Sequence, residues 1–179
     1  VCNAASNLTI FDFSNSGSNA LCPDNQRIQS NRPPLVHGTF SRFGLSGTIP
    51  SCLLTSSSIT ALSLSGNHLH GTIMSSSTQP AAASIRLQNL TPDHNGLTGS
   101  IPDWIQTHSF TELDLSNNRL DGTLSSDFMV SAYQTRLGLA VNRLSGDLPR
   151  SIIQVSSNMS SLNVLAGNIF ACNNNDLPS

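Results

Sequence analysis

Apolar and polar residues alternate at strand spacing and then give way to a fixed set of turn residues, most clearly between residues 113 and 124. This stretch reads Leu-Asp-Leu-Ser-Asn-Asn-Arg-Leu-Asp-Gly-Thr-Leu, so two leucines precede an Asn, a third Leu and a Gly. Alternation over a few residues predicts a short strand with one buried side. Because the same order of residues recurs along the chain, the sequence predicts a solenoid of stacked repeats.

Glycines and asparagines mark the repeat. The Gly after the third leucine recurs at intervals of 24, 28, 23 and 24 residues, at Gly47, Gly71, Gly99, Gly122 and Gly146. The Asn after the strand recurs at Asn67, Asn95, Asn118, Asn142 and Asn168. One coil cannot bury its leucines alone, so we expect them to fill a core shared by neighbouring coils. We expect the Asn side chains to form a buried ladder that satisfies backbone groups, and the glycines to take a positive φ.

The first repeat and the last depart from this pattern. Phe11 and Phe13 take the core positions of a degenerate first repeat, and a polar insertion follows at residues 24–34. In the last repeat Cys172 replaces the Gly, so we interpret this repeat as a cap. The predicted division is an N-terminal cap with the degenerate repeat at 1–35, the repeats at 36–158, and a C-terminal capping repeat at 159–179 that continues beyond this segment.

The fourth repeat is longer than its neighbours. Ile85 and Leu87 are predicted to form its strand, because they alternate with polar residues. Asn95 then follows about five residues later than the other repeats place it. We therefore predict that the extra residues lie within 88–94, between the strand and the Asn.

Three stretches carry a more specific signature, L-x-G-x-I-P or L-x-G-x-L-P, at residues 45–50, 97–102 and 144–149. Together with the repeat length, they resemble the extracellular plant-type leucine-rich-repeat family, and the run at 162–172 resembles the closing repeat of microalgal cell-surface proteins of this class. The chain lacks the paired-cysteine N-terminal cap with a Trp that is usual in the plant-type family.

The resemblance implies the fold and the range of functions. The expected fold is an α/β-type solenoid, a right-handed coil of about six or seven repeats with a parallel β-sheet on its concave face and a mostly irregular or 3-10 convex side. The plant-type members are ectodomains of receptor kinases and receptor-like proteins, and inhibitors of cell-wall-degrading enzymes.

Composition excludes some partners. Only 10% of the residues are charged and the net charge is -2, with no run of basic residues, so nucleic-acid binding is disfavoured. No apolar run in this segment approaches the length of a membrane span. Three N-x-S/T sequons, at Asn7, Asn89 and Asn158, and four cysteines favour an extracellular or cell-surface protein with N-linked glycans and no other cofactor.

The cysteines divide between the two ends of the predicted solenoid. Cys2, Cys22 and Cys52 lie near one end and Cys172 lies at the other. Stacked strands are about 4.8 Å apart, which puts Cys172 beyond disulfide reach of the other three. We therefore expect its partner outside this segment, and interpret the chain as an excerpt of a longer protein. Cys2–Cys22 is the preferred disulfide among the others, and Cys22–Cys52 is the alternative.

The concave sheet is the predicted binding face, because solenoids bind partners there. Arg42, Glu112, Asp114 and Arg136 are the strongest candidates, since Arg and charge pairing dominate many interfaces. The alternative is a solvated sheet face without a partner. The residues predicted to face a partner are Asp12, Ser14, His37, Thr39, Ser41, Arg42, Ser63, Ser65, Glu112, Asp114, Ser116 and Arg136.

Catalytic and metal sites find little support in the sequence. His68 and His70 flank a core leucine without a third ligand at useful spacing, which favours solvated histidines over a zinc site. Trp104 is expected to pack on the convex side. No nucleophile or phosphate-loop motif is present, so an enzyme is disfavoured.

Two functions from different classes fit these observations. The first is a non-catalytic recognition module that binds a protein, peptide or glycan. The alternative is a structural glycoprotein subunit that self-associates, because the open ends of a solenoid can stack head to tail. Ice binding ranks below both, since regular Thr rows are lacking.

Overall fold

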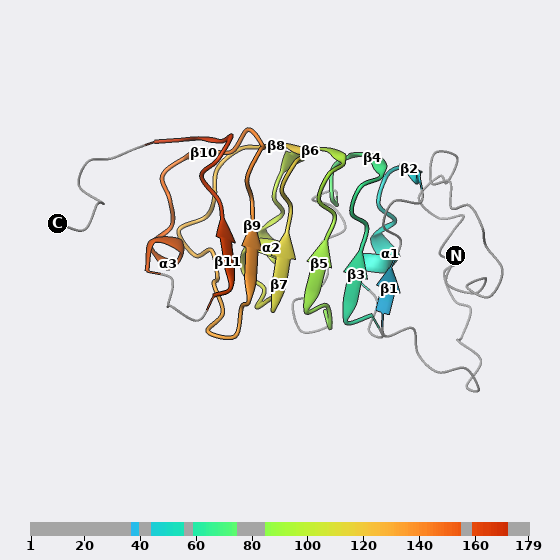
Figure 1. Cartoon of the computed structure of the whole chain (residues 1–179), viewed down its shortest axis with the longest axis horizontal. Helices are drawn as coiled ribbons and strands as arrows, with labels where there is room; N and C mark the ends of the chain where they lie inside the picture. Colours follow the sequence, from blue (N-terminus) through green and yellow to red (C-terminus); the bar gives the residue numbers. More distant parts are fainter. Residues whose placement is uncertain (1–36, 40–43, 56–58, 75–84, 155–158, 172–179) are drawn as a thin grey trace.

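The computed structural model describes residues 37–39, 44–55, 59–74, 85–154 and 159–171 (Figure 1). They form a parallel-sheet solenoid, as the repeat pattern predicts, with the strands side by side in chain order. The predicted degenerate repeat within 1–35 lies outside the described residues.

The main sheet has six parallel strands in the order β1-β3-β5-β7-β9-β11. They are β1 (His37–Thr39), β3 (Ala61–Ser63), β5 (Asn89–Thr91), β7 (Glu112–Asp114), β9 (Arg136–Gly138) and β11 (Ser161–Asn163). The central residue is a leucine in every strand from β3 to β11, and these leucines pair in register. The residues on either side of it therefore point to the outer, concave face.

A second row of short strands follows the first along the edge of the solenoid (Figure 1). It contains β2 (Ser46–Gly47), β4 (His68–Gly71), β6 (Gly96–Ser100), β8 (Arg119–Asp121), β10 (Ser145–Gly146) and β12 (Ile169–Phe170). The repeat glycine lies here with a positive φ, for example 80° at Gly146, where an added Cβ would meet Thr123 Cγ2 at 2.9 Å. The crowding and the φ value both require glycine at this position.

Three single-turn helices lie on the side opposite the main sheet: α1 (Ser51–Leu54), α2 (Asp103–Gln106) and α3 (Arg150–Ile153). Each begins directly after the proline of the L-x-G-x-I/L-P signature, with φ near −60°. Proline has this φ intrinsically and needs no backbone donor at a helix start. The side predicted to be irregular or 3-10 thus contains short turns of α-helix between irregular segments.

The leucines of successive coils pack into one continuous core. Leu62, Leu90, Leu113 and Leu137 in the main sheet are at most 2% exposed. The third leucines of the repeats, Leu45, Leu69, Leu97, Leu120 and Leu144, are fully buried. Leu162 in β11 holds the same register position but is 46% exposed, because β11 is the last strand of the sheet.

The prediction for the fourth repeat is wrong in register. Its strand is β5, not the segment around Ile85 and Leu87, and Leu90 pairs with Leu62 and Leu113. Asn95 then follows Leu90 by five residues, as Asn118 follows Leu113, so the extra residues precede the strand. The pattern misled because Pro92 occupies the second core position, while Ile85 and Leu87 are buried outside the strand and imitate its alternation.

Candidate functional site

The five repeat asparagines form one row of hydrogen bonds through the interior. Each Oδ1 accepts from the backbone N–H of a leucine in the preceding coil, at 3.0 or 3.1 Å. Each Nδ2 donates to backbone carbonyls, as Asn118 does to Pro92, Leu115 and Ser116. The Oδ1 bonds join neighbouring coils and the Nδ2 bonds also close the turn within each coil, so this row is engaged in holding the scaffold together. Its members are Asn67, Asn95, Asn118, Asn142 and Asn168.

The residue before each ladder asparagine lies in the left-handed region. Glycine occupies this position at Gly66 and Gly167, but His94, Asn117 and Val141 occupy it with φ of 53°, 55° and 56°. A β-branched side chain is strained there. Val141 is also 50% exposed, so little burial offsets the strain. Sequence reasoning did not single out this position.

A charged cluster occupies the concave face of β7 and β9. The Asp114 carboxylate accepts hydrogen bonds from the backbone N–H and the hydroxyl of Ser116, at 3.0 and 2.5 Å. The Arg136 guanidinium donates to the other Asp114 oxygen. The same guanidinium lies 3.9 Å from a Glu112 oxygen. We call Glu112, Asp114 and Arg136 the concave cluster.

Gly138 makes the concave cluster compact. It faces Asp114 in register across β7 and β9. A Cβ at Gly138 would overlap the Asp114 carboxyl group, which therefore lies across the space that a side chain would fill. The carboxylate is buried, with a side-chain exposure of 2%, and its negative charge is balanced by Arg136.

Two residues predicted to meet a partner are buried instead. Asp114 and Ser116 are 1% and 8% exposed and bind each other, so the prediction that they are free for a partner is wrong. The cause is Gly138, which gives the carboxylate room to lie down against the sheet. Glu112 and Arg136 remain accessible, with side-chain exposures of 30% and 48%.

Uncharged hydroxyls dominate the part of the face over β3 and β5. Thr91 Oγ1 donates to Ser63 Oγ at 3.0 Å. Ser65 Oγ donates to Asp93 at 2.8 Å, and the same carboxylate lies 2.7 Å from His94 Nδ1. Asp93 was missed at the sequence level because the register of its repeat was misread. Aligning repeats on the Asn alone would have found it.

Several predicted site residues lie outside the described residues. These are Asp12, Ser14, Ser41 and Arg42, the sequons at Asn7 and Asn158, and the cysteines Cys2, Cys22 and Cys172. His37 and Thr39 belong to β1 by backbone register with β3. Cys52 belongs to α1. The sequon at Asn89 falls on β5.

Metal and membrane sites are not found among the described residues. His68 and His70 are exposed on β4, and no group of three or more His, Cys, Asp or Glu side chains there could hold a metal ion. Within the same part of the chain, no helix has the length and apolarity to cross a bilayer. Trp104 is 4% exposed and lies 6.5 Å from Phe110 between ring centroids, so its ring packs in the core.

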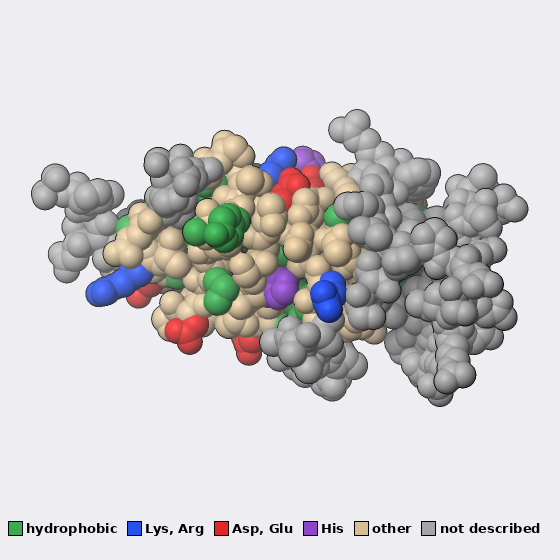
Figure 2. Space-filling view, turned by 90° about the horizontal axis from the view of Figure 1, so that it is seen from below, with side chains coloured by type: hydrophobic (Ala, Val, Ile, Leu, Met, Phe, Trp, Pro, Cys, Tyr) green, Lys and Arg blue, Asp and Glu red, His purple; other side chains and the backbone are tan. Residues whose placement is uncertain are grey.

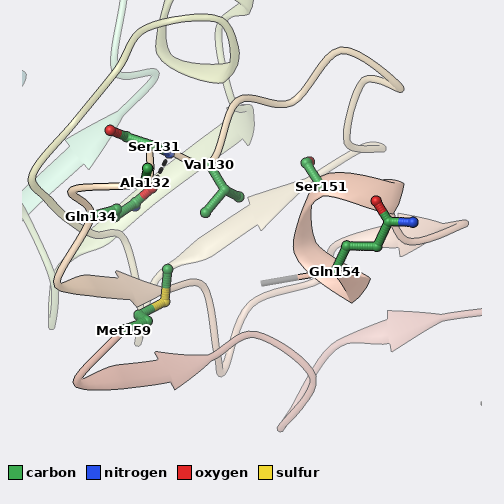
Figure 3. A pocket seen from close by; sticks show the side chains of 7 residues that line it. All are labelled: Val130, Ser131, Ala132, Gln134, Ser151, Gln154 and Met159. Atoms are coloured by element: carbon green, nitrogen blue, oxygen red, sulfur yellow. Dashed lines mark hydrogen bonds between the residues drawn. The ribbon is translucent and has the colours of Figure 1, made fainter. Parts of the chain in front are cut away.

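A small pocket opens between the segment before β9, α3 and the start of β11 (Figure 3). Its volume is about 220 Å³, below the roughly 300 Å³ at which ligand pockets begin. Two of its polar side chains bind within the protein: the Gln134 amide bonds to Ser131 and Arg136, and the Ser151 hydroxyl donates to the Phe128 carbonyl at 2.5 Å. Figure 2 shows uncharged groups over most of one face, with blue, red and purple side chains grouped at its upper edge. The concave cluster is therefore the stronger candidate.

Comparison with known proteins supports the leucine-rich-repeat fold. The family model described as Leucine Rich Repeat matches residues 109–130, which include β7 and β8. Two Arabidopsis thaliana proteins align with the chain: Receptor-like protein 32 is 33% identical over 115 residues, and Receptor-like protein 18 is 29% identical over 116 residues. The repeats of this chain are plant-type leucine-rich repeats. The alignments cover 62% and 63% of the chain but only 13% of either relative.

Solved structures of plant receptor ectodomains share this leucine-rich-repeat fold. The BIR3–SERK2 complex from Arabidopsis thaliana is similar with a TM-score of 0.57 and 30% identity, covering 75% of this chain and 68% of that chain. The ectodomain of the receptor kinase SOBIR1 from the same plant is similar with a TM-score of 0.58 and 26% identity, covering 74% of this chain and 69% of that chain. The plant peptide hormone receptor RGFR1, in complex with RGF2, is similar with a TM-score of 0.56 and 26% identity, covering 70% of this chain and 19% of that chain.

Proposed function

We propose that this leucine-rich-repeat segment is a non-catalytic recognition module, extracellular or at the cell surface, that binds a peptide or protein through its concave face. Glu112 and Arg136 carry the proposal. They place opposite charges on adjacent strands, and both side chains are accessible, whereas Ser63 and Thr91 bind each other and Asp114 binds Ser116. In such a pair Glu112 can accept hydrogen bonds from a partner while Arg136 donates hydrogen bonds to it.

The buried carboxylate supports this role by fixing the arginine. Asp114 holds one side of the Arg136 guanidinium, while Arg has five N–H donors in a rigid fork. Donors not engaged by Asp114 remain available to a partner without the full entropy cost of ordering a free side chain. Gly138 beside Arg136 has no side chain, and the Asp114 carboxylate that holds the guanidinium lies over it.

The related receptors support a peptide or protein partner. RGFR1, a plant peptide hormone receptor, was solved in complex with RGF2, and PEPR1 was solved with AtPEP1; the two share 26% and 27% identity with this chain. The chain covers only a small share of both receptors, 19% and 17%, so their ligands do not transfer to it. What supports the proposal is the shared scaffold together with the concave cluster.

A binding screen with a matched charge reversal tests the proposal. The secreted chain is passed over an array of plant secreted peptides and recombinant ectodomains, and saturable binding is measured by surface plasmon resonance. We expect a hit whose affinity falls at least about tenfold, or about 1.4 kcal/mol, in Glu112→Arg. Asp121→Arg, an exposed residue of β8 with the same charge change, should bind as the wild type does. Binding that ignores Glu112→Arg, or an array without a hit, contradicts the proposal.

Assembly is the second candidate, favoured by apolar exposure on the last described coil. Leu162, Leu165 and Ile169 are 46%, 61% and 70% exposed, whereas Leu137 in the same register as Leu162 is buried. Exposed apolar groups at a sheet edge favour pairing with another copy. Light scattering across a concentration series should then show a rising mass that Leu165→Glu abolishes. A constant monomer mass argues against it.

A further inference from the structure

The sequon at Asn89 lies on the concave sheet and not in a loop. Asn89 and Thr91 are the first and last residues of β5, and the residue between them, Leu90, is fully buried. Alternation along the strand therefore turns both the Asn and the Thr of the sequon to the concave face. We propose that Asn89 carries an N-linked glycan that covers the β3 side of the concave face and restricts a partner to the concave cluster.

The acceptor amide fits this modification. In the transfer, Asn89 Nδ2 bonds to C1 of the first sugar, the bond from C1 to the diphosphate of a lipid carrier breaks, and the amide loses one proton while the diphosphate leaves with the electron pair. The product amide keeps one N–H. That donor suffices for the one bond that Asn89 Nδ2 makes to a side chain, to Glu112 Oε2 at 3.4 Å. The modified amide therefore keeps a donor for Glu112.

The neighbours of Asn89 decide where the sugar lies. On one side, in register, stands Ala61 of β3, whose side chain ends at Cβ. On the other side stands Glu112 of β7, and beyond it Arg136 of β9. The two long charged side chains occupy the space toward β7, whereas the Ala61 side chain on the β3 side is short and partly exposed. The first sugar therefore lies over β3, above the hydroxyls of Ser63 and Thr91.

The consequence is a divided concave face. The glycan occupies the part over β3 and β5 that carries uncharged hydroxyls, and Glu112 and Arg136 stay accessible. Asn89 then acts as a boundary and not as a contact residue for the partner. The restriction of the partner rests on the proposed function, whereas occupancy of Asn89 does not.

Glycopeptide mapping tests occupancy without any partner. The chain is secreted from eukaryotic cells, and its N-linked glycans are released with an N-glycosidase in ¹⁸O water. Mass spectrometry then identifies the labelled residues. We expect the label at Asn89, its loss in Asn89→Gln and Thr91→Ala, and its retention in Thr91→Ser, which keeps the hydroxyl that bonds Ser63. Secreted, folded protein with unmodified Asn89 overturns the proposal.

Single-lysine reporters test where the glycan lies. The chain contains no lysine, so Ala61→Lys or Ser161→Lys introduces one side-chain amine, on β3 or on β11, in the same concave row. Acylation of each is followed by mass spectrometry with and without Asn89→Gln. We expect the glycan to slow acylation of the lysine at position 61 severalfold. The rate of acylation at position 161 should be the same with and without the glycan. Equal rates at 61, or slowing at 161 alone, overturn the placement. Neither readout involves a partner, so failure here is distinct from failure of the proposed function.

Discussion

The asparagine ladder and the concave cluster are both networks of polar side chains on the same coils, yet they are built differently. The ladder bonds to backbone groups that every repeat supplies, so the same geometry recurs from Asn67 to Asn168. The concave cluster consists of side-chain contacts specific to β7 and β9. Repetition thus marks the scaffold, and departure from repetition marks the surface where this chain can differ from others with its fold.

The largest effect is expected in the ladder. Asn118→Ala removes the acceptor of the Leu97 N–H and the donor to three carbonyls, so we expect a loss of about 3 kcal/mol in the free energy of unfolding. Urea denaturation followed by circular dichroism measures it. Asn117→Gly is the control: glycine tolerates the φ of 55°, so stability should be unchanged or slightly higher. Equal losses in the two variants are inconsistent with the ladder as the main polar support.

A smaller loss is expected from filling the space beside Asp114. Gly138→Ala places a Cβ in the carboxyl group and should cost about 2 kcal/mol, because the buried carboxylate must move. The same change in an Asp114→Ala background should cost less than half as much, since the obstruction is gone. This double-mutant cycle isolates the coupling. Additive losses show that Asp114 does not occupy the space above Gly138.

Removing the arginine tests the other side of the concave cluster. Arg136→Met leaves the Asp114 carboxylate with Ser116 alone, and we expect a loss of about 1.5 kcal/mol, because water can reach part of the vacated site. Arg119→Met, at an exposed position of β8, is the matched control and should be nearly neutral. Thermal unfolding of the two variants side by side decides the matter. If Arg136→Met leaves the free energy of unfolding unchanged, the ion pair between Arg136 and Asp114 does not contribute to stability.

The smallest effect should be a gain. Val141→Asn relieves the left-handed strain with a residue that the same position already carries at Asn117, so we expect stability to rise by about 0.5–1 kcal/mol. Val130→Asn, a half-buried apolar position outside this row, should lower stability. A loss in Val141→Asn contradicts the assignment of strain.

The same contrast explains what could be predicted from the sequence. The interior was predictable because its rule repeats: each Asn and each Gly could be placed from its neighbours' spacing. The register of β5 was misread, because Pro92 replaces the leucine that would have marked it and only the spacing from Asn95 indicates the strand. The burial of Asp114 could not be predicted, since it depends on Gly138, which lies 24 residues further along the chain and faces it only across the sheet.

The central claim is that recognition takes place at the β7–β9 part of the concave face. The chain has no lysine, so each single substitution to lysine gives one side-chain amine. Ser161→Lys places it on β11 beside the concave cluster, and Asp121→Lys places it on β8, away from the concave cluster. A short amine-reactive crosslinker is applied to each variant bound to the first partner from the array. Crosslinks to the partner from position 161 and not from 121 are the predicted result. Crosslinks from 121 alone would contradict the account.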